Sequence, residues 1–381
     1  MRVGGRVVAI DGNGVTLADA LGELRLRSSD ATQVAVGDLA VFEARLARGR
    51  PSTVRLVERS PGKPPDGASE FGRLAGSVGR VLVARALALR VVRDYFDDER
   101  FVEVETPIRV RSPGLDAYVD AVKVGDRWLI TSPELAMKRL LVGGLPRIYQ
   151  IARVTRADEV GDWHEPEFSM LEWYRSFSTV DAIVSDTERI VHGVVRALTG
   201  TSTIVTSAGA RIDARPPFAR ITVRDAFRIY AGVSDAADLA ATDVDRYFQT
   251  FVDDVEPGIS HHQKPVLLTE FPITQGALAR PCAHDDSVSE RFELYAGGIE
   301  LSNGFGELTD PVEQRRRFEA EQARRRRAGA PDHPIDERFL TALEEGMPPS
   351  GGNALGFDRL VALALGLGRI ADVMAFPMTR A

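Results

Sequence analysis

The sequence predicts an α+β protein in which a small all-β domain precedes a larger domain with an antiparallel sheet flanked by helices. Short alternating apolar segments fill residues 1–60, and a Pro/Gly-rich stretch without periodicity follows them. From residue 74 onward strand-like segments are many, but regular strand–helix–strand units are few, which favours an antiparallel or mixed sheet. We therefore expect domains at 1–60 and 74–381, joined by a linker at 61–73.

Composition excludes several classes of protein. The 381 residues carry a net charge of -7, so the surface as a whole is not a general nucleic-acid binder. No apolar run reaches the ~18 residues that a membrane-spanning helix needs, and the N-terminus lacks the apolar core of a signal peptide, so we expect a cytoplasmic protein without membrane contact. The single cysteine, Cys282, forms neither an internal disulfide nor a cysteine-based zinc site.

The first domain has the pattern of five short strands separated by turns. Evenly spaced strands of this kind predict a barrel of the OB type. Its one aromatic residue is Phe42, whereas single-stranded nucleic acid is bound on several aromatic rings. The strands are expected at residues 3–10, 15–18, 23–26, 39–46 and 53–57.

The second domain begins with a helical pattern from Leu74 to Phe96, followed by an alternating strand at 101–107 that ends at a proline. Further strands are expected at 119–124, 127–131, 147–154, 168–174, 265–269, 290–296 and 352–357. Helices are expected between them at 134–142, 179–199, 222–231, 243–254, 311–328, 336–346 and 358–367.

Three blocks of this domain combine residues suited to phosphate chemistry. Residues 156–174 read as two strands joined by a polar loop, which places arginine, histidine, aromatic and carboxylate side chains on one sheet face. Glu293 and Glu300 can converge across a tight hairpin to hold Mg²⁺, which favours one or two carboxylates plus substrate phosphates. The glycine-rich strand at 351–356 lets a ligand approach the backbone, and Arg359 follows it at the start of a helix.

Together these blocks resemble the catalytic domain of class II aminoacyl-tRNA synthetases, specifically the lysyl branch. Residues 101–107 look like motif 1 of that family, 156–168 like motif 2 and 352–359 like motif 3, while 132–140 and 303–310 are similar to its lysine-specific segments. The resemblance implies a homodimer that uses ATP and Mg²⁺ to join an amino acid to AMP as an aminoacyl-adenylate, with release of pyrophosphate.

The resemblance also implies roles at the ATP site, where positioning and charge neutralisation of phosphates dominate the chemistry. Arg156, Glu300 and Arg359 are the expected catalytic residues. Arg156 is expected to contact the α-phosphate, and His164 to lie near the outer phosphates. Phe168 is expected beneath adenine, with Arg359 on the opposite face of the base and Asp158 and Gly356 beside the nucleotide. Glu293 and Glu300 are expected to hold Mg²⁺.

A lysine-like substrate brings two ammonium groups, and burying either one requires a charged or strongly polar partner. By resemblance, Glu134 is expected to bind the α-ammonium, and Glu307, with Tyr174 and Glu172, the side-chain ammonium. The remaining pocket residues are expected to be Gly114, Ser132, Asn303, Phe305 and Ala354.

A closer resemblance is to the lysyl-synthetase paralogues that attach (R)-β-lysine to a lysine of elongation factor P. Residues 170–175, 298–305 and 370–376 match their pattern, and Ala354 stands where true lysyl synthetases carry glycine. Residues 1–60 are too short for a full anticodon-binding module. The resemblance therefore implies activation of lysine or (R)-β-lysine and transfer to elongation factor P. The alternatives are a minimal lysyl-tRNA synthetase that charges tRNA(Lys) and a catalytically degenerate binding module.

Two features depart from the family pattern or lie outside it. Asp158 stands where a glutamate is usual, and Glu165 stands in place of an asparagine. A carboxylate close to the phosphates of ATP repels them unless it points away or binds a metal ion. The arginine runs 315–317 and 324–327 predict either a solvated helix face or a docking surface for an acidic partner.

Overall fold

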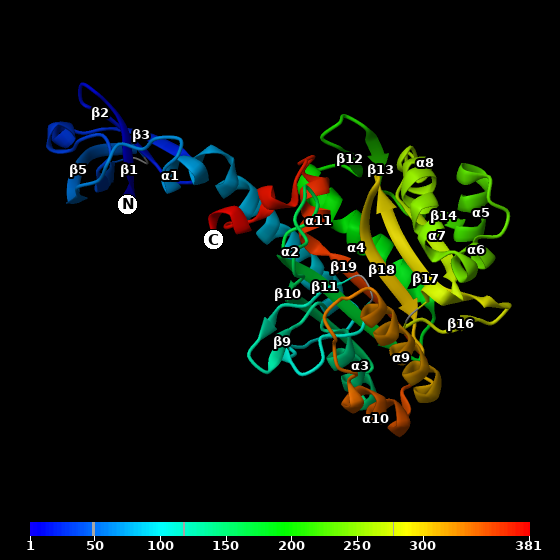
Figure 1. Ribbon diagram of the computed structural model, residues 1–381. Helices are drawn as coiled ribbons and strands as arrows, with labels where there is room; N and C mark the ends of the chain where they lie inside the picture. The colour runs from blue at the N-terminus through cyan, green and yellow to red at the C-terminus, as the bar shows by residue number, and fades with distance from the viewer. Residues whose placement is uncertain (48–49, 117–118, 277) are drawn as a thin grey trace. The chain divides into compact units, whose positions relative to one another are not determined.

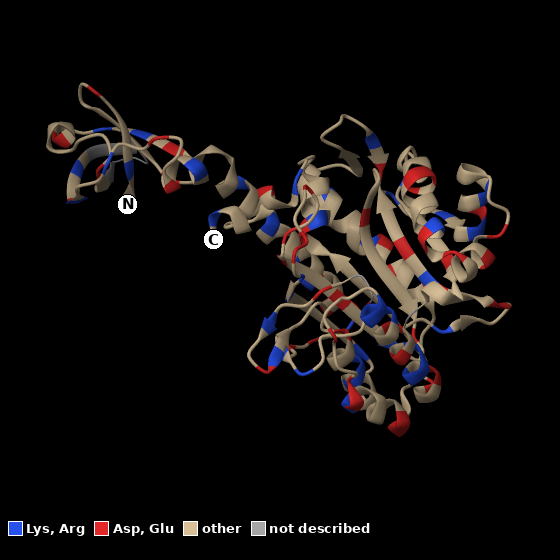
Figure 2. Cartoon of the chain, in the orientation of Figure 1, with Lys and Arg blue, Asp and Glu red and all other residues tan. Residues whose placement is uncertain are grey.

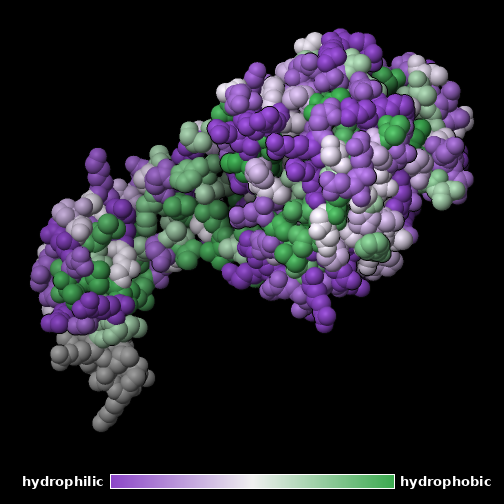
Figure 3. All heavy atoms as spheres, turned by 90° about the horizontal axis from the view of Figure 1, so that it is seen from below, coloured by the Kyte–Doolittle hydropathy of each residue, from purple (hydrophilic) through white to green (hydrophobic). Residues whose placement is uncertain are grey.

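The computed structural model describes residues 1–47, 50–116, 119–276 and 278–381. They form two compact units, Met1–Ala86 and Leu87–Ala381, and the boundary between them lies within helix α2 (Gly79–Asp98) (Figure 1). In the part of the chain that is described, none of the helices combines the length and the hydrophobicity needed to cross a bilayer. The face of the larger unit visible in Figure 3 is mainly hydrophilic, with hydrophobic residues in small groups.

The first unit contains an antiparallel sheet with the strand order β3-β2-β1-β4-β5. Alternation buries one set of side chains, among them Val7, Val15, Leu17 and Phe42, in a common core. This confirms the five predicted strands, and within the described residues β3 and β5 do not pair, as in a partly open OB barrel. The elements are β1 (Arg2–Asp11), β2 (Gly14–Ala18), β3 (Glu23–Arg27), η1 (Ser29–Gln33), β4 (Leu39–Ala47), β5 (Arg50–Ser60), α1 (Glu70–Arg73) and η2 (Leu74–Val78).

The second unit is built on a sheet with the order β14-β15-β17-β18-β19-β11-β10-β6, and β16 pairs with β17 beside this path. Neighbours run antiparallel except β14 with β15 and β6 with β10, which confirms the predicted α+β class. The strands of the unit are β6 (Val102–Glu103), β7 (Arg109–Val110), β8 (Lys123–Val124), β9 (Arg127–Leu129), β10 (Arg147–Thr155), β11 (Glu167–Ser176), β12 (Thr203–Val205), β13 (Arg211–Asp213), β14 (Ala219–Thr222), β15 (Val266–Pro272), β16 (Pro281–Cys282), β17 (Asp285–Ala296), β18 (Ile299–Gly306) and β19 (Ser350–Gly356).

Helices α4 and α11 pack on one face of this sheet. Asn353 of β19 donates to Thr187 of α4 over 2.8 Å, and Asp358 of α11 accepts from the backbone N–H of Ser169 in β11 over 2.8 Å. The opposite face stays open to the site described below. The helices are α3 (Glu134–Val142), α4 (Val180–Thr199), α5 (Val223–Ala226), η3 (Phe227–Ala231), α6 (Ala236–Thr242), α7 (Val244–Thr250), η4 (Phe251–Val255), α8 (Glu256–Ser260), η5 (Ile273–Gln275), α9 (Pro311–Arg327), α10 (Glu337–Gly346), α11 (Phe357–Ala364), η6 (Ile370–Val373) and η7 (Met378–Arg380).

Several predicted elements differ from the structure. The strand expected at 101–107 is reduced to β6, because only two of its residues pair with β10 and Pro107 has no N–H to extend the ladder. The strand expected at 119–124 is reduced to the two residues of β8. Strand β18 was expected only as one arm of a hairpin, since its glycines and polar residues mask the alternation.

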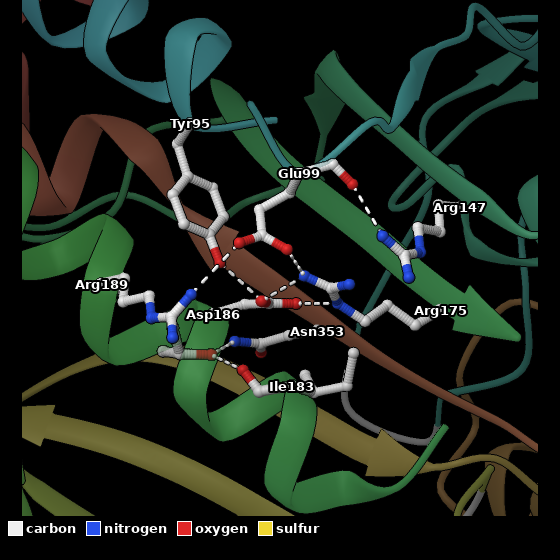
Figure 4. Close-up of polar contacts among 9 residues, drawn as sticks. Tyr95, Glu99, Arg147, Arg175, Ile183, Asp186, Arg189 and Asn353 are labelled. Carbon is white, nitrogen blue, oxygen red and sulfur yellow. Dashed lines mark hydrogen bonds and ion pairs between the residues drawn. The ribbon is translucent and has the colours of Figure 1, made fainter. Parts of the chain in front are cut away.

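An ion network with a buried centre, Arg175 and Asp186, joins α2, β11 and α4 on the side of the sheet that carries α4 (Figure 4). Arg175 donates to both carboxylate oxygens of Asp186, at 2.6 and 2.7 Å, and to Glu99 at 3.0 Å. Tyr95 donates to Asp186 over 2.6 Å, and Arg189 lies 3.2 Å from Glu99. We call these five residues the Arg175 cluster; its two guanidinium groups balance its two carboxylates.

Candidate functional site

A cavity of about 340 Å³ lies over the open face of the sheet, against β11, β17, β18 and β19. Cross-strand pairing sets Glu293, Asn303, Ala354 and Glu172 side by side in one row across these four strands. Because side chains alternate along a strand, the row and its neighbours two residues away share one face. The segment that holds Gly114, together with the start of α3, closes the other side of the cavity.

One end of the cavity carries an aromatic ring and two arginines. Phe168, Arg156, Gly356 and Arg359 all line it, and the guanidinium of Arg156 lies 5.3 Å from the centre of the Phe168 ring. Arg359 donates to the backbone oxygens of Trp163 and Glu300, each over 3.0 Å. The Nε of Arg156 is buried without a hydrogen-bond partner in the described part of the chain. A flat base and an anionic phosphate fit this combination of groups.

The loop between β10 and β11 explains the two departures from the family pattern. Glu165 is buried and accepts from the backbone N–H of Met378 over 2.9 Å, so its carboxylate turns toward the end of the chain. Asp158 is exposed, has a φ of 61° and does not line the cavity, whereas Glu159 lies 3.6 Å from Arg156. His164 does not line the cavity either; burial, followed by the charge of Arg359, lowers its pKa.

Two carboxylates, Glu293 and Glu300, line the cavity beside Arg359. Burial, followed by the charge of Glu293, raises the pKa of Glu300 to about 7. Glu293 accepts from Arg291 and, over 2.7 Å, from the hydroxyl of Tyr295. The described residues hold no group of three or more potential metal-ligating side chains. Two hard oxygen donors with excess negative charge nevertheless fit Mg²⁺, which completes its shell with water and phosphate oxygens.

The other end of the cavity leads to a fully buried lysine. The ammonium nitrogen of Lys138 lies 2.6 Å from Glu134 Oε1 and 2.5 Å from Glu307 Oε2. Burial disfavours the charged form of Lys138, but the charges of Glu134 and Glu307 outweigh it and raise its pKa. Glu134 lines the cavity, whereas Glu307 lies behind Lys138. Lys138 is therefore the residue through which Glu307 is connected to the site.

Glu172 belongs to the same buried group. It accepts from Ser132 Oγ over 2.5 Å and from Tyr174 Oη over 3.1 Å. Burial, followed by the charge of Glu134, raises the pKa of Glu172 to about 8. We call Glu134, Lys138, Glu172 and Glu307 the Lys138 cluster; with all four ionised, its net charge is about -2.

The structure therefore brings most of the predicted pocket residues together in two layers. Six line the cavity: Gly114, Ser132, Glu134, Asn303, Phe305 and Ala354. Glu172, Tyr174 and Glu307 form a buried second layer behind them. Gly352 makes this layering possible, because a Cβ there would overlap the Tyr174 ring and lie 2.7 Å from Glu307 Oε1.

Two charged residues of the site, Lys138 and Arg291, were not predicted from the sequence. A lysine four residues after a glutamate on a helix usually forms an exposed pair, so the local sequence does not indicate that Lys138 is buried. Arg291 lines the cavity, donates to Asn303 over 3.2 Å and stacks 4.4 Å from the Phe271 ring. The signal for Arg291 was its position two residues before Glu293, on the same face of a strand.

Most arginines of the α9 runs pair with carboxylates of the same molecule, and Figure 2 shows mixed charges along α9 and α10. Arg315 pairs with Glu337, and Arg316 with Glu313. Arg325 is fully buried and donates to the backbone oxygens of Asp116 and Val119, over 2.7 and 3.0 Å. Arg325 thus anchors residues that line the cavity, which favours a structural role over a docking surface.

Comparison with known proteins agrees with this geometry. Residues 74–380 match the family described as tRNA synthetases class II (D, K and N). Two curated relatives are named elongation factor P–(R)-β-lysine ligase: one from Proteus mirabilis (strain HI4320), 40% identical, and one from Edwardsiella ictaluri (strain 93-146), 39% identical. Each alignment spans 314 residues, 79% of this chain and 95% of the relative.

These matches confirm both resemblances predicted from the sequence, to the synthetases and to the elongation factor P ligases. The family uses ATP, in agreement with the aromatic ring and the arginines at one end of the cavity. The chain belongs to the class II tRNA synthetases of the D, K and N group.

Proposed function

We propose that this protein is an ATP-dependent ligase that activates lysine or (R)-β-lysine as an aminoacyl-adenylate and transfers it to a lysine of elongation factor P. The observation that carries the substrate class is the Lys138 cluster. Its three carboxylates exceed its one ammonium by two charges, and a lysine-type amino acid brings two ammonium groups. A buried excess of this kind is costly unless a ligand neutralises it.

In the first step, a carboxylate oxygen of the amino acid attacks the α-phosphorus of ATP. The bond from that phosphorus to the bridging oxygen breaks, and pyrophosphate leaves with the electron pair. We assign Arg156, which lies against Phe168, to stabilise charge on the α-phosphate, and Arg359 to contact the opposite face of the base. Glu293 and Glu300 would hold Mg²⁺, which neutralises phosphate charge when bound.

In the second step, a neutral acceptor amine attacks the carbonyl carbon of the adenylate. A C–N bond forms, the bond between the carbonyl carbon and the phosphate oxygen breaks, AMP leaves with the electron pair, and the amine nitrogen releases one proton to solvent. The names of the two relatives support a lysine of elongation factor P as this acceptor. The small N-terminal unit contains a single aromatic residue, Phe42, in its strands, and that ring is buried, which argues against base stacking there.

The test offers both acceptors to one enzyme. Purified protein is incubated with ATP, Mg²⁺ and either lysine or (R)-β-lysine, in the presence of elongation factor P and bulk tRNA. We expect a mass gain on elongation factor P, amino-acid-dependent pyrophosphate exchange and uncharged tRNA. Charged tRNA with unmodified elongation factor P would instead identify a minimal lysyl-tRNA synthetase, and absence of exchange would identify a binding module.

We further propose that the enzyme acts as a homodimer, because the motif 1 resemblance at 101–107 is typical of class II dimers. Size-exclusion chromatography with light scattering tests this directly: the 41.6 kDa chain should elute with about twice that mass.

A further inference from the structure

A second cavity, of about 300 Å³, adjoins the first inside the same unit. The two share five lining residues: Leu115, Asp116, Arg291, Glu293 and Glu300. The second cavity is therefore continuous with the end of the site where the phosphates and the reacting carbonyl belong. None of Arg156, Phe168 and Arg359 lines the second cavity, and no residue of the Lys138 cluster lines it either.

Aromatic rings form the wall of the second cavity. Tyr247 of α7 and Phe251 of η4 pack with Phe271 and Tyr295 in one core cluster, and all four line the cavity. A hydrocarbon chain fits against such a wall, and an ammonium group is attracted to the faces of aromatic rings. The wall thus suits an alkylammonium side chain.

The charges of the second cavity favour a cation. With every group ionised, its described lining carries five carboxylates and two guanidinium groups, an excess of three negative charges. An excess of one negative charge remains when Glu293 and Glu300 hold Mg²⁺. Apart from the two predicted Mg²⁺ ligands, the carboxylates include Glu256 and Glu321, and these belong to helices α8 and α9 rather than to the sheet. Pyrophosphate or an RNA backbone would be repelled here, whereas an ammonium group would be attracted.

One polar group in the wall has no partner. Tyr247 is 2% exposed, and its hydroxyl makes no hydrogen bond within the described part of the chain. Burial raises the pKa of Tyr247, so the hydroxyl is neutral and its oxygen can accept a hydrogen bond. A buried hydroxyl without a partner destabilises the protein, and a donor on a bound ligand would remove that cost.

We infer that the second cavity binds the side chain of the acceptor lysine, with its methylene chain on the aromatic wall and its amine directed to the shared boundary with the adenylate cavity. This inference rests on the proposed function and names the route of its second substrate. It assigns residues of α7, η4 and α8 to acceptor binding, a role separate from amino-acid activation.

The first test fills the mouth of the cavity. Val252 lines it and is 55% exposed, so Val252→Trp adds bulk without replacing a core side chain. Asp254→Trp is the matched control, because Asp254 is exposed on the same short helix and does not line the cavity. We expect Val252→Trp to raise the KM for elongation factor P at least about tenfold, and Asp254→Trp to leave it unchanged.

The second test removes only the unpartnered hydroxyl. Tyr247→Phe keeps the ring and is expected to raise the KM for elongation factor P about fivefold, with little change in the KM for ATP or for lysine. Pyrophosphate exchange is measured for every variant, since it reports the first half-reaction alone.

Each outcome decides the matter. A wild-type KM for elongation factor P in both cavity variants, or an equal loss of exchange and transfer in Val252→Trp, overturns the inference; the equal loss would assign the cavity to activation. If the unmodified enzyme shows normal pyrophosphate exchange but transfers the amino acid only to tRNA, the inference is also overturned. Absence of exchange in the unmodified enzyme refutes the proposed function instead.

Discussion

Strand β11 carries a charged cluster on each of its two faces, and the two clusters differ in their charge balance. Toward α4, Arg175 and its partners are balanced, and every carboxylate there has a guanidinium within 3.2 Å. Toward the cavity, Glu172 belongs to a cluster in which one ammonium faces three carboxylates. Only two residues along one strand separate Glu172 from Arg175.

The difference shows how to distinguish a structural ion network from a binding site. A balanced, hydrogen-bonded network needs no further partner and holds α2, β11 and α4 together. In an unbalanced cluster, burial and then the charge of a neighbouring carboxylate raise the pKa of a carboxyl group, as at Glu172, and favour its protonation until a cation arrives. The excess charge, rather than the number of charged residues, indicates the ligand.

The largest effect is expected from Glu307→Gln in the unbalanced cluster. The amide keeps the shape but removes one of the charges that match a diammonium substrate. We expect kcat/KM for lysine-dependent pyrophosphate exchange to fall by about 10³-fold, or about 4 kcal/mol, while ATP affinity changes less than about twofold. Wild-type exchange in this variant would contradict the charge assignment.

The matching change in the balanced cluster is Asp186→Asn. It leaves the buried Arg175 with one carboxylate fewer, and breaking a buried pair costs about 3–5 kcal/mol of stability. We therefore expect a lower urea midpoint, followed by circular dichroism, with an unchanged KM for lysine in the folded enzyme. A raised KM with normal stability would mean that this cluster also serves the substrate.

A smaller effect is expected from Ala354→Gly, which changes the shape of the cavity but not its charge. Ala354 lines the cavity between Asn303 and Glu172, so its methyl group contacts the space for the amino acid. We expect the ratio of kcat/KM for α-lysine over (R)-β-lysine to rise about tenfold. An unchanged ratio would remove Ala354 as a specificity determinant.

The smallest effect is expected from pH. Below its pKa of about 8 Glu172 is largely neutral, and the raised pKa of Glu307 acts in the same direction, so the cluster attracts a diammonium substrate less at low pH. The KM for lysine should fall about fivefold between pH 6.5 and 8.5. Asp186→Asn should keep this profile, and Glu172→Gln should flatten it; a rise of KM with pH would contradict the assignment.

The sequence predicted the sheet and the nucleotide end of the site well because both depend on local patterns. Alternation and helical periodicity located β11, β19 and α3 to within about two residues. Phe168, Arg359 and Glu300 stand within motifs whose strand and turn context places them on one face. These residues need only their own segment to be correctly folded.

The features of the site that were not predicted depend on contacts between segments far apart in the sequence. Lys138 is buried by Glu307, and Arg325 by Asp116 and Val119, partners about 170 to 210 positions away along the chain. No local pattern distinguishes such side chains from exposed ones, so Lys138 received no role and the arginine run was open to two readings. The second cavity was not predicted either, because its aromatic wall comes from helices that carry no motif.

The anchoring of residues 116 and 119 by Arg325 has a consequence for biosynthesis. The segment that covers the cavity is made early, but the guanidinium that fixes it belongs to the end of α9 and leaves the ribosome some two hundred residues later. Until then the nascent chain has no completed substrate cavity, and β19, which forms its floor, follows later still. A growing chain therefore has no finished site for ATP or amino acid until synthesis is nearly complete.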